Sequence, residues 1–260
     1  MRVAEKIKET LPSGTEQEFR SLLLSISDSK LLLGYHYGEW TFRTPTLESG
    51  IATCNFAQDE LGHVRLLHGL LKNSMGESDK TLVHDRNASD YLSVRSLNID
   101  IPNWLELISL SAVIDTGLTI LLRSLSDSSF RPLRDRVGKI LQEEKFHTDY
   151  TNAWIISLTN ESDERSKSVS DIFRRTIPVY AEWLNSLNTA GLLEAGIQTR
   201  SNQAILDETI DTLDALAAKA GLSAPNTSEI TSDQEADLPL HPEEDIIYSI
   251  RGQKNEVYRV

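Results

Sequence analysis

Cysteine, glycine and proline are scarce in this 260-residue sequence, and each shortage limits what the chain can be. The single cysteine, Cys54, cannot form an internal disulfide and is typical of a reducing compartment. The sequence contains no glycine-rich phosphate loop and no short internal repeat. Long segments without proline, together with little strand-like alternation, predict helices as the main element.

Positive charge and long apolar runs are also in short supply. The 26 lysines and arginines face 39 acidic residues, and the net charge of −13 argues against a general nucleic-acid-binding protein. The longest apolar runs are far shorter than a membrane span, and the first residues lack the apolar segment of a signal peptide. We therefore expect a cytoplasmic protein that binds neither nucleic acid nor membrane.

Turn and cap residues divide the sequence into the helices of an all-α fold. Helices are expected over residues 15–37, 46–73, 103–126, 131–158, 161–187 and 202–220. Thr15 and Glu18 match the capping-box pattern, and Pro178 predicts a kink in the fifth helix. The first four helices, with a long connection between the second and third, fit a ferritin-like four-helix bundle with one crossover.

The composition changes after residue 222. Residues 1–222 are expected to form the helical domain, in which further helices follow the bundle. Residues 223–260 begin with an acidic, proline-containing stretch, which predicts an extended or partly disordered tail.

Two Glu-x-x-His pairs lie on otherwise apolar helix stripes. Glu60 and His63 share a face of the second helix, Glu144 and His147 share a face of the fourth, and Asp115 lies in the apolar middle of the third. Because burying an unpaired carboxylate is costly, we expect a compensating cation. Two Glu-x-x-His pairs plus one acid from each remaining helix form the di-iron or di-manganese carboxylate pattern, and these ligands suit iron.

The first helix departs from this pattern. Its apolar stripe carries Lys30, Asp28 lies off that face, and Glu39 is about 13 Å further along a continuous helix. An ammonium group about 4 Å from a divalent cation would repel it by ~8 kcal/mol at an effective dielectric near 20. A buried salt-bridge network around Lys30 is therefore the alternative to a metal site.

At these residues the sequence resembles the phenylacetyl-CoA monooxygenase (ring 1,2-epoxidase) family of ferritin-like proteins. The resemblance is carried by GEWTFRTPTLESGIATCNFAQDELGH, VIDTGLTILLRSL and KILQEEKFHTDY. Five residues match the family's iron ligands: Glu60, His63, Asp115, Glu144 and His147. The family's first-helix glutamate falls on Lys30, whereas Asp28 and the Glu39-Trp40 pair look more like the family's non-catalytic structural subunit.

The resemblance implies a subunit of a multicomponent di-iron monooxygenase that acts on an aromatic acyl-CoA in phenylacetate catabolism. It implies a homologous oxygenase subunit and a separate reductase as partners, within a homodimer or heteromer. Glu60 and Glu144 would be the catalytic iron ligands, bridging or terminal. Two other functions stay open: a non-catalytic structural subunit, in which Lys30 would bond to Glu60 or Glu144, and a stand-alone ferritin-like di-iron oxidase.

Several neighbouring residues carry further expectations. Asp59 and Asp149 are candidates to accept hydrogen bonds from the imidazoles, and the alternative that they are exposed helix acids is as good. Trp40 and Phe42 are expected to anchor the connector in the core, and His68 is expected at the surface.

Overall fold

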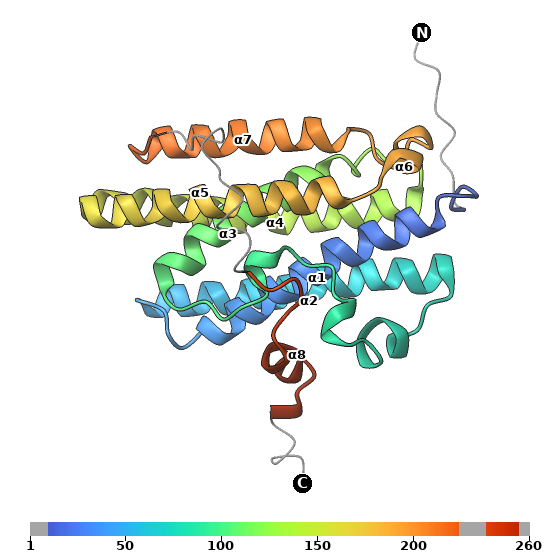
Figure 1. Ribbon diagram of the computed structural model, residues 1–260, viewed down its shortest axis with the longest axis horizontal. Coiled ribbons are helices and arrows are strands. Elements are labelled where there is room, and N and C mark those ends of the chain that lie inside the picture. Colours follow the sequence, from blue (N-terminus) through green and yellow to red (C-terminus); the bar gives the residue numbers. More distant parts are fainter. Residues whose placement is uncertain (1–9, 224–237, 255–260) are drawn as a thin grey trace.

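The computed structural model describes residues 10–223 and 238–254, and within these ranges it contains helices and no β-strand (Figure 1). The long helices are α1 (Glu16–Trp40), α2 (Leu47–Met75), α3 (Trp104–Arg123), α4 (Arg131–Glu161), α5 (Asp163–Ser186) and α7 (Asn202–Lys219). Two short helices follow α5 and α7 in the chain, namely α6 (Ala190–Glu194) and α8 (Glu244–Ile250). Each long helix begins and ends within three residues of its expected bounds.

The helices pack as a bundle with additions on one side. α1 packs along α2, and α3 packs along α4, while α2 and α4 close the bundle between the two pairs. α5 and α7 lie over α3, so that Figure 1 shows α7 at the outer edge and the α1–α2 pair at the opposite side. The predicted all-α, ferritin-like bundle with additional C-terminal helices is therefore confirmed.

Of the residues expected to form the C-terminal tail, the structure describes residue 223 and residues 238–254. The acidic stretch expected to form the tail falls mostly on residues 224–237, outside the described residues. Residues 238–254 contain α8, whose Ile246 and Ile247 are buried. The predicted division after residue 222 stays a prediction.

Side-chain caps explain where two bundle helices begin. The Thr46 hydroxyl accepts a hydrogen bond from the Ser49 amide at 3.1 Å, and the Asn103 side chain accepts one from the Glu106 amide at 2.8 Å. The capping box predicted at Thr15 is wrong, because its hydroxyl donates instead to the Pro12 carbonyl oxygen at 2.6 Å. α5 runs through Pro178 as one helix.

The connector between α1 and α2 has one aromatic side chain in the core and another at the surface. Trp40 is 8% exposed, and its indole N–H donates to the Ile101 carbonyl oxygen at 3.3 Å, as expected for an anchor. Phe42 is 98% exposed, so the expectation that it also anchors the connector is wrong. Because Phe42 lies in the turn after α1 ends, its side chain leaves the stripe that faces the core.

The crossover between α2 and α3 is fixed to α1 by a buried ion pair. It contains three short elements, η1 (Lys80–His84), η2 (Ala88–Asp90) and η3 (Arg95–Leu97). The Asp28 carboxylate accepts two hydrogen bonds from the Arg86 guanidinium, at 2.7 and 2.6 Å, and a third from the Leu92 amide at 2.9 Å. Both side chains are buried, and this pair is one of the contacts that hold the crossover on the bundle.

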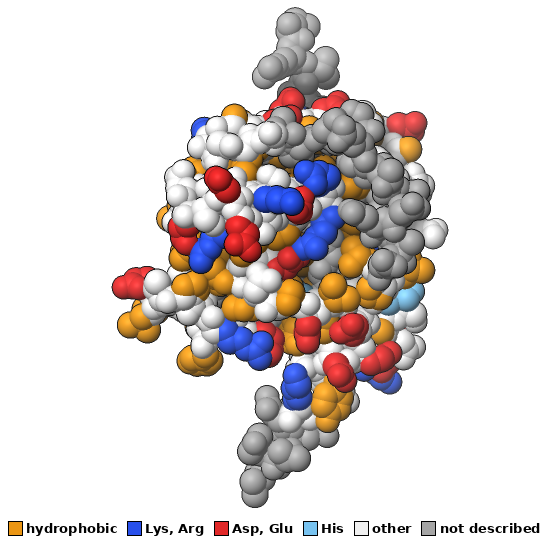
Figure 2. Space-filling view, turned by 60° about the vertical axis from the view of Figure 1, so that its left-hand side comes forward, with side chains coloured by type: hydrophobic (Ala, Val, Ile, Leu, Met, Phe, Trp, Pro, Cys, Tyr) orange, Lys and Arg blue, Asp and Glu red, His pale blue; other side chains and the backbone are white. Residues whose placement is uncertain are grey.

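Helix α3 is the most apolar element of the fold. By length and hydropathy it would pass as a membrane span, yet 89% of its apolar window is buried inside the protein. The outer surface is very different, since acidic and basic side chains lie interspersed with hydrophobic ones on the face shown in Figure 2. α3 is thus the centre of the core, and the helices around it carry the polar surface.

Candidate functional site

Five of the site residues predicted from sequence meet in the interior of the bundle. We call them the acid–histidine cluster; it consists of Glu60 and His63 on α2, Asp115 on α3, and Glu144 and His147 on α4. The side chains of all five are fully buried. Each Glu-x-x-His pair spans about one helical turn, so both members project from the same face toward the bundle axis.

The distances within the acid–histidine cluster are short. One ligand atom each from Glu60, Asp115, Glu144 and His147 can be chosen so that all four lie within 4.8 Å of one another. The Nδ1 atom of His63 lies 3.1 Å from a Glu144 oxygen and 3.4 Å from a Glu60 oxygen. As a set of oxygen and nitrogen donors, this cluster is a grouping that can hold a metal ion.

Lys30 on α1 reaches into the middle of the cluster. Its ammonium nitrogen lies 2.8 Å from a Glu144 oxygen, 3.1 Å from a Glu60 oxygen and 3.9 Å from an Asp115 oxygen. Lys30 is fully buried, so these carboxylates are its compensating charges. The salt-bridge network weighed as the alternative to a metal site is therefore present.

No carboxylate from α1 joins the cluster. α1 continues without a break through Gly34 and Gly38, and Glu39 near its end is exposed. Asp28 is buried, but it belongs to the ion pair with Arg86 on the crossover. The place where the di-iron pattern requires a fourth acid is thus taken by the side chain of Lys30.

The charges of the cluster compensate one another. Although burial opposes the charged form, the neighbouring Glu144 and Glu60 raise the pKa of His63 to about 9. The neighbouring carboxylates of Asp59 and Glu60 likewise outweigh burial and raise the pKa of His147 to about 10. Lys30 holds the pKa of Glu60 well below its usual range despite burial. Protonated imidazoles and an ammonium group therefore face ionised glutamates in a dry interior.

Burial has the opposite result for Asp115. It raises the pKa of this carboxyl group to about 7, because Lys30 lies further from Asp115 than from the two glutamates. The Tyr37 hydroxyl donates to Asp115 at 2.8 Å. This contact was not predicted, because an aromatic residue on an apolar stripe is usually part of the core and nothing more.

The outer nitrogens of the two imidazoles are held by acids from opposite helices. His147 Nε2 donates to Asp59 on α2 at 3.3 Å, as the sequence suggested for Asp59. His63 Nε2 donates to Glu143 on α4 at 2.8 Å, a contact that was not predicted. Asp149 instead accepts from Lys145 at the surface. The signal that would have found Glu143 is that an acid directly precedes each Glu-x-x-His pair.

The other histidine of α2 also differs from its expectation. His68 was expected at the surface but is only 6% exposed. Burial lowers its pKa, and its Nε2 atom has no hydrogen-bond partner among the described residues. It lies outside the acid–histidine cluster.

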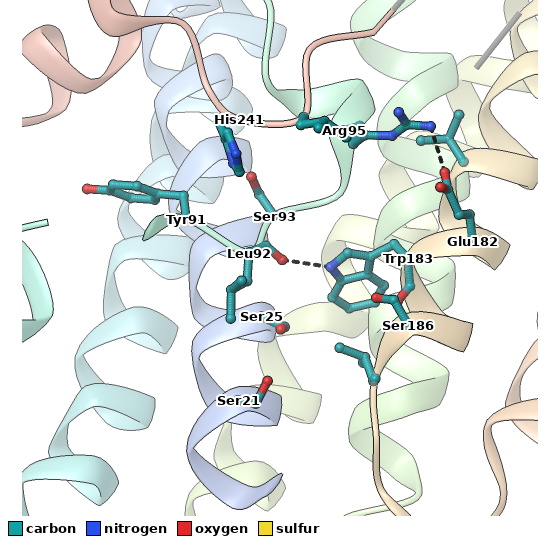
Figure 3. A pocket seen from close by; sticks show the side chains of 13 residues that line it. Ser21, Ser25, Tyr91, Leu92, Ser93, Arg95, Glu182, Trp183, Ser186 and His241 are labelled. Atoms are coloured by element: carbon teal, nitrogen blue, oxygen red, sulfur yellow. Dashed lines mark hydrogen bonds and ion pairs between the residues drawn. The ribbon is translucent and has the colours of Figure 1, made fainter. Parts of the chain in front are cut away.

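A separate cavity lies between α1, the crossover and α5 (Figure 3). It encloses about 300 Å³ and is lined in part by Ser21, Ser25 and Trp183. The Trp183 indole N–H donates to the Leu92 carbonyl oxygen at 2.7 Å across its wall. None of the residues that line this cavity belongs to the acid–histidine cluster.

The residues present do not fit a pair of iron ions. The ammonium group of Lys30 lies within 3.9 Å of all three carboxylates of the cluster, where a divalent cation would have to sit. Its positive charge would repel such an ion, and no acid from α1 compensates. The role of the five cluster residues as iron ligands stays a prediction.

The chain is similar to proteins of known family. The sequence model of the family described as phenylacetic acid catabolic protein matches residues 1–249. The chain is also 24% identical over 162 residues to one of the subunits of the 1,2-phenylacetyl-CoA epoxidase of Escherichia coli (strain K12). That alignment covers 60% of this chain and 65% of the relative, so the chain spans less than two thirds of the relative's length. Because the family match runs over nearly the whole chain, the protein belongs to the phenylacetic acid catabolic protein family.

Proposed function

We propose that this protein is a structural subunit of a multicomponent oxygenase that acts on an aromatic acyl-CoA, phenylacetyl-CoA, in phenylacetate catabolism. The family and the relative named as an epoxidase subunit support the pathway and the multi-subunit assembly. The single observation that carries the structural role is the ion-pair network of Lys30 with Glu60 and Glu144. The oxygen-activating chemistry then belongs to a homologous subunit, and electrons come from a separate reductase.

In this role the buried charges of the cluster hold four helices together. α1 contributes Lys30, α2 and α4 contribute the two glutamates, and α3 contributes Asp115. A buried, hydrogen-bonded polar network specifies how helices pack, because any other arrangement leaves charges unpaired. The proposal places the protein in the cytoplasm, which its single cysteine and the burial of α3 support.

A second candidate function is a catalytic di-iron subunit of the same assembly. One observation favours it, namely that ligand atoms of Glu60, Asp115, Glu144 and His147 lie within 4.8 Å of one another. Lys30 counts against it, because the ammonium group lies among those atoms. A stand-alone oxidase meets the same objection and has no support from the comparisons.

The proposal is tested by reconstitution. The chain is co-expressed with a homologous bundle subunit that has all four acids, and the purified mixture is assayed with the reductase for consumption of phenylacetyl-CoA. We expect the two subunits to elute together, and the homologue to lose most of its activity when this chain is left out. A chain that elutes alone and leaves the activity of the homologue unchanged would contradict the proposed function.

A further inference from the structure

The lysine of α1 stands at the one position where the acid–histidine cluster departs from a metal-binding set. Each of the other bundle helices contributes at least one acid, and α2 and α4 add one imidazole each. α1 contributes an ammonium group with three N–H donors. Two of these donors are taken by Glu60 and Glu144, and Asp115 lies 3.9 Å away.

The carboxylates of the cluster lie around this ammonium group. The Oε2 atom of Glu60 and the Oδ1 atom of Asp115 are buried and form no hydrogen bond with the described residues. Such atoms are the ones that a cation can compensate in a dry interior. The nearest cation to Asp115 Oδ1 is Lys30 itself, at 3.9 Å.

The side chain of Lys30 has no simple route out of the cluster. It is fully buried, and one turn further along α1 the backbone of Gly34 runs close to α2. A Cβ atom added to Gly34 would lie 3.0 Å from the Cβ atom of Glu60. Because the helices are packed so tightly here, a metal ion can enter only if the core opens and the ammonium group leaves it.

We propose that Lys30 is the resident cation of this cluster, that its ammonium group takes the place of divalent metal, and that the centre is metal-free in the working protein. A single change, Lys30→Glu, then converts the cluster into a metal-binding centre, because it removes the ammonium group and adds the acid that α1 lacks. This inference does not depend on the substrate or the assembly, since metal content is measured on the chain alone.

Three variants of the full chain test the inference. Lys30→Glu removes the cation and adds a ligand, whereas Lys30→Met removes the cation only. Lys145→Met is the matched control, because Lys145 also pairs with an acid of α4, Asp149, but at the surface. Each protein is reconstituted anaerobically with Fe(II), and in parallel with Mn(II), desalted, and analysed for bound metal and for Tm.

The expected results differ between the variants. The unaltered protein and Lys145→Met carry no stoichiometric metal, and their Tm does not change with Mn(II). Lys30→Glu binds about two ions per chain, and its Tm rises by roughly 5 °C or more with metal. Lys30→Met has a lower Tm than the unaltered protein without metal, and Mn(II) restores part of the loss.

Two results would overturn the inference. One is stoichiometric metal in the unaltered protein, in which Lys30 is intact. This measurement tests the inference even if both Lys30 variants fail to fold. The other is a folded Lys30→Glu protein, judged by circular dichroism, that takes up no metal. Metal in the unaltered protein would also count against the structural role proposed above. A chain that fails to elute with the homologous subunit would contradict that role but leave the metal-free centre untouched, so the two failures are distinguishable.

Discussion

At the scale of single residues, the interior of this protein depends on charges that are buried together. Lys30 has three carboxylates within 3.9 Å, and both imidazoles of the cluster lie against the same glutamates. Removing one partner of such a network leaves the others uncompensated, which typically costs about 3–5 kcal/mol. Lys30 therefore matters to stability, whatever the protein does in its assembly.

His36 shows the opposite solution, a buried histidine that stays neutral. It is 2% exposed, and its Nε2–H donates to the Leu97 carbonyl oxygen at 2.9 Å. Burial lowers its pKa from the ordinary value of 6.5 to about 4. Between these two pH values the unfolded chain binds more protons than the folded protein, so folding stability must fall as the pH drops from 6.5 toward 4.

The His36→Gln variant tests this pH dependence. Glutamine keeps an N–H donor for Leu97 but cannot be protonated, so the variant should lose less stability on acidification, by about 3 kcal/mol in total. The free energy of unfolding is measured by urea titration at several pH values between 7 and 4. His84→Gln, at an exposed position, is the control and should follow the unaltered protein. If the free energy of unfolding falls equally with pH in His36→Gln and in the control, buried His36 is not the cause of the pH dependence.

At the scale of helices, one close approach fixes how α3 and α5 pack. A Cβ atom built on Gly117 of α3 would lie 2.3 Å from Cζ of Tyr180, so the tyrosine ring rests directly on the α3 backbone. Tyr180 is fully buried, so its ring is enclosed by the core on all sides. Glycine is required here for space, since α3 has ordinary helical geometry at this position.

Gly117→Ala should therefore destabilise the protein by about 2–3 kcal/mol, the cost of overpacking a rigid core. Gly138→Ala on α4 is the matched control, because its added Cβ would meet nothing within 4 Å. In a helix interior that control should gain roughly 0.5–1 kcal/mol from helix propensity. Urea unfolding of both variants gives the comparison, and equal effects of the two substitutions would contradict the packing argument.

The sequence specified the helices that carry the site better than it specified their contacts. The position of Glu60, Asp115 and Glu144 on the apolar faces of their helices was enough to predict that they point into the interior. Helical periodicity is a local property, so it can be read from the sequence. The same periodicity placed Lys30 inside but could not say whether its ammonium group meets the acids. Which acid binds which imidazole, as for Glu143 and His63, depends on how α2 and α4 align, and that is a tertiary property.

At the scale of the whole molecule, the Asp28–Arg86 pair ties the crossover to the bundle. The pair is buried, and Arg86 also lies over the Tyr91 ring at 4.2 Å. α8 adds to this side, where Ile247 packs with Ala88 and Tyr91. The long connection expected from sequence is an ordered part of the fold, and one aspartate of α1 accepts three hydrogen bonds from it, two from Arg86 and one from Leu92.

Asp28→Asn should loosen the crossover as a unit. The substitution keeps the size of the side chain but leaves the buried Arg86 charge uncompensated, at an expected cost of about 3–5 kcal/mol. Hydrogen exchange of residues 86–97 should accelerate far more than that of α3. The control is Asp79→Asn, which removes an exposed pair with Lys72 and should change stability far less than Asp28→Asn does. Similar losses of stability in both variants would contradict the role of the Asp28–Arg86 pair in holding the crossover.

The burial of α3 has a consequence for synthesis of the chain. Most of its covering surface comes from α4, α5 and α7, which all follow it in the sequence. On the ribosome, a segment with the length and hydropathy of a membrane span therefore emerges before the partners that will enclose it. Until α7 has been translated, the apolar segment of α3 is therefore accessible to chaperones and to the targeting machinery. In the folded protein the same segment is buried.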